Sequence, residues 1–545
     1  MNEKKKIILN ETFASAVQNH KKGNFQVAEK LYKEILNVDP KHLQSIILLG
    51  TLSGQMKNFD FAKQLLRKAI KINPNYAETH YKLGIILKEL GEVQEAINCY
   101  EKAIELNPNY AEAHNNIGNL LRTSGKIEKA INCFEKAIEI NPNDADVYNN
   151  LGNCYEELKN FKKAINCYEK AIELNPNYVD AYNNLGIAFK NFGKVQKAIN
   201  CYKKTIQLES NHADAHNNLG LVLLLKGDFV QGWREYEWRL KCSTFEIHDR
   251  NFPQPCWQGS DINKKFMLIW GEQGVGDQIM FASLLSRFQQ QAQRVFVEIQ
   301  RRLVPLFKRS FPEVSFFSIQ DPPNSRLLDR SIHYQLPMGS LAQWLLPNEE
   351  SFPKSYSYLK SDSDKTRKLK AKYQQLANGK LLIGISWKSV NKYIGKPKST
   401  SLIQWGGLLS QKDCFFVNLQ YSDVKIEIDA FTNQTGLSIY RDEDIDSLKS
   451  LDDFASQVAA LDLVISIDNS TVHVAGALGR SVWTLLQYAP DWRWQLDRSD
   501  TPWYPSMTLY RQPVLGDWCS VFQQVQGDLQ RFVEQFANVK NSYAP

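Results

Sequence analysis

The chain has no apolar run long enough to cross a membrane and no cysteine pair of the kind that binds zinc. A spanning helix needs roughly 18 consecutive apolar residues, and no run in the 545-residue sequence approaches that length. The apolar stretch near the N-terminus, IIL at 7–9, is too short for a signal peptide. None of the nine cysteines forms a C-x-x-C motif, so we expect no metal site from them. We therefore expect a cytoplasmic protein without a transmembrane segment, for which peripheral membrane contact stays open.

A strong excess of one charge is also missing. The 66 Lys and Arg residues nearly balance the 59 Asp and Glu residues, which leaves a net charge of +7. The basic residues are dispersed among acidic ones, so nucleic acid is not an expected partner. A chain of 545 residues is too long for one hydrophobic core. We expect two to four domains, and the sequence leaves the oligomeric state open.

The first 244 residues carry a 34-residue period. Prolines recur at Pro40, Pro74, Pro108, Pro142 and Pro176, with Ser210 at the next step. Glycines recur at Gly50, Gly84, Gly118, Gly152, Gly186 and Gly220, and alanines at Ala28, Ala62, Ala96, Ala130, Ala164 and Ala198. Two helices per unit with this placement of Gly, Ala and Pro resemble the tetratricopeptide repeat. The period predicts seven units, starting at residues 7, 41, 75, 109, 143, 177 and 211.

The repeat positions have simple physical roles. Small residues let paired helices approach closely, and proline stops the second helix before the next unit. The last unit has Gly232 where the alanine would recur, which predicts a cap against the following domain. Four cysteines also follow the period, and we interpret them as small packed hydrophobic residues in a reducing compartment: Cys99, Cys133, Cys167 and Cys201.

An asparagine ladder is predicted on the first helix of the later repeats. The residues two positions before the repeat glycine are Asn116, Asn150, Asn184 and Asn218. Such repeats present a concave groove lined by their first helices, and side-chain amides can both donate to and accept from a peptide backbone. The protein O-GlcNAc transferases have a similar ladder, and that resemblance implies a groove for a protein acceptor. The alternative is that these asparagines only form a solvated face.

After a predicted linker at 245–262, the pattern changes to short apolar runs that alternate with helical segments. Buried parallel strands are predicted for FMLIW, RVFVEI and VSFFSI, and then for LLIGISW, FFVNLQ, LDLVISID and SVWTLLQ. A polar helical segment at 359–380 separates the two series. We therefore predict two Rossmann-like α/β domains, at 263–375 and 376–545, that face each other across a cleft.

The stretch GEQGVGDQ, at 271–278, lies where the first strand gives way to a helix. Its glycines, Gly271, Gly274 and Gly276, form G-x-x-G-x-G rather than the dinucleotide fingerprint G-x-G-x-x-G. A plain Rossmann dehydrogenase is therefore disfavoured. The acid that follows, Asp277, has two interpretations on these residues alone: the N-cap of the helix or a catalytic carboxylate.

The segment LDLVISIDNSTVHVAGALGRSVWTLL, at 461–486, predicts a strand, a polar turn, a helix and another strand. Ser470 and Thr471 open the helix, where hydroxyls and free N–H groups favour an anion such as a pyrophosphate. The motif D-x-S-x-x-H-x-x-G-A-L-G, followed by YAPDWRW and PWYPSMTLYRQ, resembles the C-terminal half of glycosyltransferase family 9. That family includes the ADP-heptose lipopolysaccharide heptosyltransferases and has the GT-B fold. The most similar subgroup is bacterial and carries tetratricopeptide repeats in front of this domain.

The resemblance implies roles for individual residues. Gly276 and Asp277 match the position of the catalytic base in the heptosyltransferases, and Gly271 and Gly274 would line the cleft. Donor contacts are implied for a larger set: Ser386, Lys388, Asp468, Asn469, Ser470, Thr471, His473 and Arg493. Because this chain lacks the arginine-bearing loop that is common in the family, Lys396 or Lys398 could replace Lys388 as the phosphate cation. No D-x-D motif lies near the donor site, in keeping with metal-independent transfer, and DEDIDSL at 442–448 is interpreted as a solvated loop.

The sequence therefore predicts a glycosyltransferase with a nucleotide-sugar donor and an acceptor recruited by the repeats. The nucleotide sugar is a co-substrate, and no cofactor is expected. Two alternatives remain. The repeats could be a protein-binding scaffold joined to a relic GT-B domain, or the acceptor could be a lipid-linked or polysaccharide glycan. The sequence leaves the sugar, the nucleotide and the anomeric outcome open.

Overall fold

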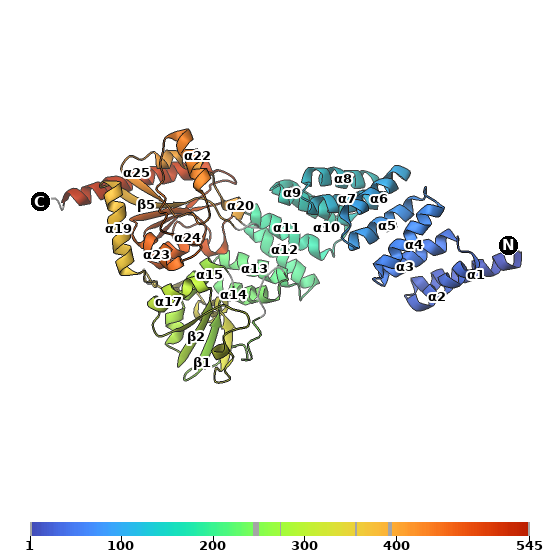
Figure 1. Ribbon diagram of the computed structural model, residues 1–545, viewed down its shortest axis with the longest axis horizontal. Coiled ribbons are helices and arrows are strands. Elements are labelled where there is room, and N and C mark those ends of the chain that lie inside the picture. The colour runs from blue at the N-terminus through green and yellow to red at the C-terminus, as the bar shows by residue number, and fades with distance from the viewer. Residues whose placement is uncertain (1–2, 244–249, 273, 355–356, 391–394, 543–545) are drawn as a thin grey trace. The chain divides into compact units, whose positions relative to one another are not determined.

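The computed structural model describes residues 3–243, 250–272, 274–354, 357–390 and 395–542 (Figure 1). The chain divides into two compact units, Met1–Phe189 and Lys190–Pro545. The first unit contains repeats only. The second contains the last repeats together with both β-sheets, so the division between the two units falls inside the repeat array.

The first unit consists of helices that follow the predicted period. Its first helices begin at Leu43, Ala77, Ala111, Ala145 and Val179, each 34 residues after the one before. Within each repeat up to α10, the first helix packs against the second. The helices are α1 (Glu3–Lys21), α2 (Phe25–Val38), α3 (Leu43–Gln55), α4 (Phe59–Ile72), α5 (Ala77–Glu89), α6 (Val93–Leu106), α7 (Ala111–Thr123), α8 (Ile127–Ile140), α9 (Ala145–Glu157), α10 (Phe161–Leu174) and α11 (Val179–Asn191). The predicted tetratricopeptide-type superhelix is confirmed for this region.

The repeat glycine is required by close packing of an aromatic ring. A Cβ atom at Gly84 would lie 2.6 Å from the ring of Tyr100, and one at Gly118 would lie 2.6 Å from Phe134. Any larger residue at these positions would push the two helices of a repeat apart. The prediction that small residues allow close approach is confirmed.

The second unit begins with the end of the repeat array. It contains α12 (Val195–Leu208), α13 (Ala213–Leu225), α14 (Phe229–Tyr236) and the 3₁₀ helix η1 (Glu237–Lys241). At Gly220 the close neighbour is backbone, because an added Cβ would lie 2.6 Å from the nitrogen of Tyr236. The last α-helix of the array, α14, has 8 residues and is followed directly by η1.

The first sheet of this unit has four parallel strands in the order β3-β2-β1-β4. The strands are β1 (Phe266–Trp270), β2 (Arg294–Ile299), β3 (Ser315–Ser318) and β4 (Tyr334–Pro337). The first three confirm predicted strands, and β4 was not predicted. The order reverses between β1 and β4, which makes the carboxyl end of β1 a place where doubly wound folds bind ligands.

The second sheet has five parallel strands in the order β6-β5-β7-β8-β9. They are β5 (Leu381–Ser386), β6 (Cys414–Asn418), β7 (Leu463–Ile467), β8 (Val482–Leu486) and β9 (Met507–Arg511). Tyr440 adds a parallel bridge outside β6, at Val417. This sheet reverses its order between β5 and β7.

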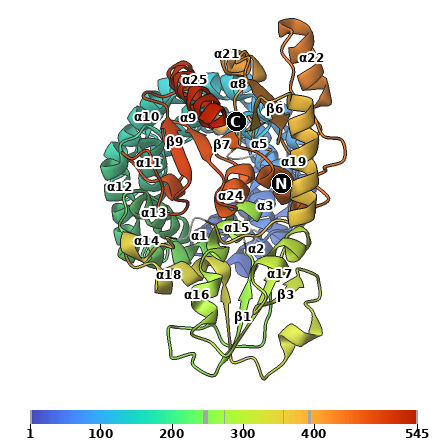
Figure 2. The same ribbon diagram turned by 90° about the vertical axis from the view of Figure 1, so that its left-hand side faces the viewer.

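Helices cover and join the two sheets. They are α15 (Val275–Ala282), α16 (Leu285–Gln289), α17 (Val304–Ser310), α18 (Leu341–Leu345), α19 (Ser363–Ala377), α20 (Gly395–Lys398), α21 (Gly406–Leu409), α22 (Lys425–Thr435), α23 (Leu451–Ala459), α24 (Ser470–Ala477) and α25 (Trp518–Ser542). Shorter 3₁₀ turns are η2 (Arg301–Leu303), η3 (Ser325–Leu328), η4 (Met338–Ser340), η5 (Glu349–Ser351), η6 (Leu402–Trp405) and η7 (Trp492–Trp494). Within the second unit, α15 and α24 pack against each other between the two sheets (Figure 2). Among the described residues no helix is both long and apolar enough to span a membrane.

Two local predictions differ from the structure. The predicted linker is irregular from residue 250 onward but is packed, since Arg250 is buried and pairs with Glu298 of β2; residues 245–249 lie outside the described part. The interpretation of DEDIDSL as a solvated loop is wrong for its first residue. Asp442 is buried, and it accepts hydrogen bonds from the Tyr373 hydroxyl at 2.7 Å and from Lys372 Nζ at 2.9 Å.

Candidate functional site

A cleft of about 340 Å3 lies at the carboxyl ends of both sheets of the second unit. Residues that follow β1 form one wall, and residues that follow β5 and β7 form the other. The lining includes Gly274, Val275, Gly276, Asp277, Arg302, Ser389, Val390, Lys398, Tyr421, Ser447, Leu448, Leu451, Phe454, Asp468, Asn469, Ser470, His473, Asp491 and Arg493. Both points of strand-order reversal therefore open on the same cleft, which is where open α/β folds bind their ligands.

Two helices begin at this cleft. Gly274 is the N-cap of α15, and Asn469 is the N-cap of α24, where its side chain accepts a hydrogen bond from the Thr471 amide at 2.9 Å. Each helix is 8 residues long. The partial positive charges of two helix N-termini thus meet in one cavity, which favours an anionic ligand.

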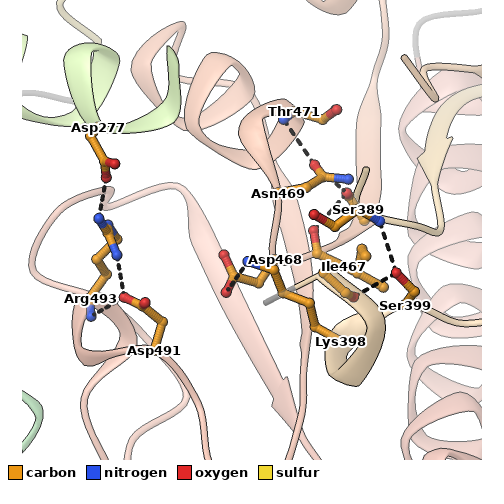
Figure 3. Close-up of polar contacts among 12 residues, drawn as sticks. Asp277, Ser389, Lys398, Ser399, Ile467, Asp468, Asn469, Thr471, Asp491 and Arg493 are labelled. Carbon is orange, nitrogen blue, oxygen red and sulfur yellow. Dashed lines mark hydrogen bonds and ion pairs between the residues drawn. The ribbon is translucent and has the colours of Figure 1, made fainter. Parts of the chain in front are cut away.

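Asp277 is not the N-cap of α15. It is the third residue of that helix, and its carboxylate pairs with the guanidinium of Arg493, which also binds the Asp491 carboxylate at 2.5 Å (Figure 3). The N-cap interpretation is therefore wrong, because Gly274 occupies the capping position. Arg493 belongs to η7. Its contact with Asp277 joins residues 216 positions apart in the sequence, and both residues line the cleft.

The charge state of Asp277 is set by opposing effects. Burial raises the pKa of the Asp277 carboxyl above its usual value, while Arg493 opposes that shift. For Asp491 the balance is reversed, and Arg493 together with Lys398 holds its pKa below the usual value in spite of burial. One arginine between two acids keeps the group compact and polar, and Asp277 is the more basic of the two carboxylates.

Lys398, and not Lys388, is the lysine at the cleft. Lys398 Nζ lies 3.2 Å from Asp468, and both residues line the cavity. Lys388 instead forms an ion pair with Glu427 of α22. The prediction of Lys388 as a cleft cation is thus corrected: its main chain follows β5 as expected, but its side chain is neutralised elsewhere. The side chain of Lys396 lies outside the described part.

Ser386 and Asn469 form the polar support of the second wall. The Asn469 amide donates to Ser386 Oγ at 2.8 Å, and Ser386 donates to Gln420 Oε1 at 3.0 Å. Gln420 Oε1 also accepts from the backbone amide of Lys388 at 2.9 Å. Ser386 is fully buried, so its predicted ligand contact is replaced by a role in holding the end of β5 against the cap of α24.

Ser470 and Thr471 differ in spite of their adjacency. Ser470 lines the cavity, whereas the Thr471 side chain is fully buried. Among the described residues, Thr471 Oγ1 has no hydrogen-bond partner. The predicted anion turn therefore presents one hydroxyl to the cleft and not two.

His473 lies on α24 with one ring edge toward α15. Its Nδ1 lies 2.9 Å from the Tyr504 hydroxyl, and its ring stacks on Trp494 with centroids 5.4 Å apart. A Cβ atom at Gly276 would lie 2.8 Å from His473 Cδ2, which explains the glycine. Burial is the main cause that lowers the pKa of His473 to about 3, with help from Arg493 and Lys398.

The other two predicted cleft glycines have different surroundings. A Cβ atom added at Gly274 would meet no other atom within 4 Å, and Gly274 lines the cavity. Gly271 lies behind it, where a Cβ would come 2.7 Å from the Gln278 side chain. Its amide donates to the Glu298 carbonyl at 2.7 Å, so Gly271 joins β1 to β2 rather than lining the cleft.

The asparagine ladder makes contacts between repeats. Asn116 donates to the Tyr81 hydroxyl at 3.2 Å, Asn150 to Asn115 at 3.0 Å and Asn184 to Asn149 at 3.1 Å. These donors reach back one repeat, so the ladder joins neighbouring first helices and is not only a solvated face. Asn218 belongs to the second unit and is half-buried.

A buried ion cluster under the cleft was not predicted. Arg239 of η1 is fully buried, and its Nε and Nη2 each lie 2.8 Å from the Glu272 carboxylate. The same guanidinium binds Ser340 Oγ at 2.9 Å, and Glu272 also accepts from the Gly339 amide at 2.7 Å. The only local indication of this cluster in the sequence is Glu272 in the GEQG stretch, because its basic partner, Arg239, belongs to the last repeat.

The tryptophans near the motif are structural. Trp492, Trp494 and Trp503 are buried, and Trp492 packs edge-on against Trp233 of α14 with centroids 5.4 Å apart.

In the described residues no group of three or more His, Cys, Asp or Glu side chains is placed to hold a metal ion.

Comparisons with known proteins support the repeats. Models described as "Tetratricopeptide repeat" match residues 145–178 and 167–200, and one described as "TPR repeat" matches 86–123, 118–159 and 192–227. A model described as "Anaphase-promoting complex, cyclosome, subunit 3" matches residues 21–103. The predicted tetratricopeptide repeats are confirmed, and they mark this region as a scaffold of the kind that binds proteins.

Individual relatives cover parts of the chain. Protein FlbA of Caulobacter vibrioides is 31% identical over 325 residues, which is 57% of this chain and 54% of that protein. The chain thus spans about half the length of this curated relative. Among solved structures, MamA is 30% identical and covers 30% of this chain and 94% of its own, with a TM-score of 0.28. YrrB, described as a TPR protein with an unusual peptide-binding site, is 20% identical over 34% of this chain and 95% of its own, with a TM-score of 0.30.

Proposed function

We propose that the second unit is a glycosyltransferase that moves a sugar from a nucleotide-sugar donor to an acceptor recruited by the repeats. The observation that carries the proposal is the convergence on one cleft of two helix N-termini, cationic side chains and the carboxylate of Asp277. The described cations that line it are Arg302, Lys398 and Arg493. A diphosphate leaving group needs the positive partners, and an attacking hydroxyl needs a base. The parallel sheets and the family 9-like motif agree with a GT-B arrangement.

In this proposal the diphosphate lies against the start of α24. Ser470 Oγ and the free amides of the first turn would donate to its oxygens, and Lys398 would neutralise part of its charge. Lys398 is held by Asp468, with 3.2 Å between charged atoms, so the cation is in place before the donor arrives. Stabilising charge that develops on the leaving group is the main electrostatic contribution to such a transfer.

Asp277 would take the proton of the acceptor hydroxyl as the bond to the anomeric carbon forms. Its Oδ1 is bound by Arg493, which leaves Oδ2 as the oxygen for the acceptor. Burial raises its pKa, which makes it a stronger base than an exposed aspartate, while Arg493 opposes that shift. The absence of a side chain at Gly276 lets the His473 ring lie against the first turn of α15, beside this carboxylate.

The acceptor class follows from the repeats. Their tetratricopeptide character favours a protein acceptor or a protein that presents the acceptor. The side-chain amide nitrogen of each ladder asparagine in the first unit donates to the preceding repeat, and that of Asn184 donates twice. The side-chain carbonyl oxygens of the same asparagines would accept from the backbone of a bound peptide. A glycan acceptor, with repeats that serve assembly, is the second candidate.

Two lysines that follow the same strand provide a matched test. Lys398→Gln should weaken binding of a nucleoside diphosphate, because removing a charged hydrogen bond costs about 1.5–3 kcal/mol. Lys388→Gln should leave binding unchanged, since that lysine pairs with Glu427 outside the cleft. Thermal shift and titration calorimetry with UDP, GDP, ADP and CMP would measure both. Equal effects of the two substitutions, or no stabilisation by any of these nucleotides, would contradict the proposed donor site.

A further inference from the structure

We propose that Trp492 is a positioning residue for the proposed transfer, and that the last two repeats act on the Asp277 base through it. The indole of Trp492 supports the Arg493 guanidinium that binds Asp277, while helix α14 and two repeat turns hold Trp492 and its loop. All of these residues belong to the second unit. The role rests on the proposed function, and it gives the repeats a part in the transfer besides recruitment of the acceptor.

The argument begins at the guanidinium of Arg493. Its Nη2 pairs with Asp277, and its Nη1 lies 2.5 Å from the Asp491 carboxylate (Figure 3). Its Nε has no hydrogen-bond partner in the described part of the chain. One face of the group is covered instead, since Cζ lies 4.5 Å from the ring centroid of Trp492. An indole face attracts a cation, so Trp492 fixes the plane of the guanidinium that the two carboxylates hold at its edge.

Trp492 is fixed in turn by the last repeat. Its ring is buried and packs edge-on against Trp233, with centroids 5.4 Å apart and an interplanar angle of 89°, and against Tyr236 at 5.7 Å. Trp233 and Tyr236 both belong to α14. The same indole stacks on Phe281 of α15, the helix of Asp277, at 6.4 Å. Trp492 is absent from the described lining of the cleft, so it acts on a ligand through its neighbours.

Two repeat turns contact the ends of the same loop. A Cβ atom added at Gly193, in the turn between α11 and α12, would lie 2.7 Å from the ring of Tyr488. One added at Gly227, between α13 and α14, would lie 3.4 Å from Nε2 of Gln495. These two contacts bound residues 488–495, which we call the arginine loop. The last two repeats therefore hold this loop at both ends and, through α14, at its centre.

The repeat array provides a matched pair of substitutions for this contact. Gly125 occupies the same turn two repeats earlier, with φ of 74° against 75° at Gly193, and an added Cβ would meet no atom within 4 Å. Lys159, in the repeat between them, has φ of 59°, so this turn accommodates a side chain. Both glycines are exposed. Gly193→Ala and Gly125→Ala should therefore lose similar stability, but only Gly193→Ala should displace Tyr488.

The two alanine variants should differ in turnover. With the nucleotide sugar that stabilises the parent, kcat should fall about three- to tenfold in Gly193→Ala, because small displacements of positioning groups slow a reaction strongly. In Gly125→Ala kcat should equal that of the parent. Equal kcat values in the two variants would overturn the contribution of the repeats.

Substitutions at Trp492 test the support of the arginine. Trp492→Leu removes the aromatic face, and kcat per folded protein should fall about 10- to 100-fold. Trp492→Phe keeps an aromatic face and should recover most of the loss. Affinity for a nucleoside diphosphate should be unchanged in both, since the diphosphate is expected at α24. A folded Trp492→Leu protein with the parent kcat would overturn the proposal, and so would a fall in nucleotide affinity as large as the fall in kcat.

A double-mutant cycle separates positioning from a general loss of structure. If Trp492 acts through the carboxylate of Asp277, then Trp492→Leu should not lower the residual kcat of Asp277→Asn any further. An effect that is independent of Asp277 would give the same fold loss in both backgrounds. The same fold loss in both backgrounds would overturn the positioning role.

The support of Arg493 can also be measured without substrate. In protein labelled with ¹³C,¹⁵N-arginine, the two Nη nitrogens of Arg493 should give separate signals, because each is held by a different carboxylate. Arg493→Lys assigns these signals. In Trp492→Leu they should merge as the guanidinium rotates, and two separate, unshifted signals there would overturn the proposal. If the parent transfers sugar from no nucleotide sugar, the proposed function fails, while this measurement still tests whether Trp492 holds Arg493.

Discussion

At the scale of single residues, the ionisable groups of the cleft are held in pairs and chains. Asp277 shares Arg493 with Asp491, Lys398 pairs with Asp468, and His473 is bound by Tyr504. Pairing keeps these buried groups in defined charge states, since an unpaired buried charge is costly. It also fixes where each polar atom points before a ligand enters.

His473 gives a pH-dependent prediction. Its pKa is about 3 in the folded protein, against about 6.5 for an unfolded histidine. Between these values only the unfolded state binds the proton, so the free energy of unfolding falls by up to about 1.4 kcal/mol for each pH unit of acidification. The contribution is fully present above the unfolded pKa and is lost as the pH falls below it.

His473→Gln should remove this dependence. Between pH 7.5 and 5.0, urea denaturation should show that the parent loses about 2 kcal/mol more stability than the variant. The variant is expected to be less stable at pH 7.5, so the comparison uses the difference between the two pH values for each protein. Equal losses in parent and variant would mean that His473 is not held neutral.

At the scale of elements, α15 and α24 do most to define the site, because both begin at the cleft. Local patterns predicted both helices, and they predicted seven of the nine strands found in the described part of the chain. The two missed strands are short and partly exposed: β4 has 4 residues and ends at Pro337, and β9 has 5 residues, with Thr508 exposed and Arg511 half-buried. The helix predicted after GEQGVGDQ is divided into α15 and α16 near Ser283, whose hydroxyl donates to the Met280 carbonyl at 2.7 Å.

Two substitutions in the first turn of α24 test the roles of its two adjacent hydroxyls separately. Ser470→Ala should weaken nucleoside diphosphate binding by about 1.5–3 kcal/mol, since a hydroxyl bond to a charged group is lost. Thr471→Val should leave binding unchanged and should maintain or raise stability, because it replaces a buried hydroxyl without a described partner by a methyl group. Calorimetric titration and melting curves of both variants measure these effects. A larger binding loss in Thr471→Val than in Ser470→Ala would contradict the assigned orientation of the turn.

At the scale of the molecule, the last repeat is part of the unit that contains the cleft. Arg239 is buried against Glu272, and the indole of Trp233 donates to the Leu346 carbonyl at 3.0 Å. Sequence patterns identified the repeats and the sheets but not these contacts, because each joins residues 33 or 113 positions apart. For the same reason they suggested Asp277 and Arg493 separately and gave no sign that the two form an ion pair.

Truncation tests this integration. A fragment of residues 245–545 loses both partners, which exposes apolar surface and leaves Glu272 buried without its arginine. Removing one partner of a buried ion pair costs about 3–5 kcal/mol. We expect this fragment to aggregate or melt far below the full chain, while residues 190–545 should fold cooperatively and bind nucleotide. Comparable stability of the two fragments in calorimetry would show that the last repeat is a separate module.

The most direct test of the central claim is the turnover of Asp277→Asn, normalised to folded protein, with the nucleotide sugar that stabilises the parent. Asparagine can still accept a hydrogen bond from Arg493, and Asp491 still balances the arginine, so stability should fall by about 1–3 kcal/mol. Nucleoside diphosphate affinity should be nearly unchanged, because the diphosphate is expected at α24 and not at Asp277. The amide cannot take the acceptor's proton, so kcat should fall roughly 10²–10⁴-fold. Transfer by the folded variant at the parent rate would show that Asp277 is only a structural partner of Arg493.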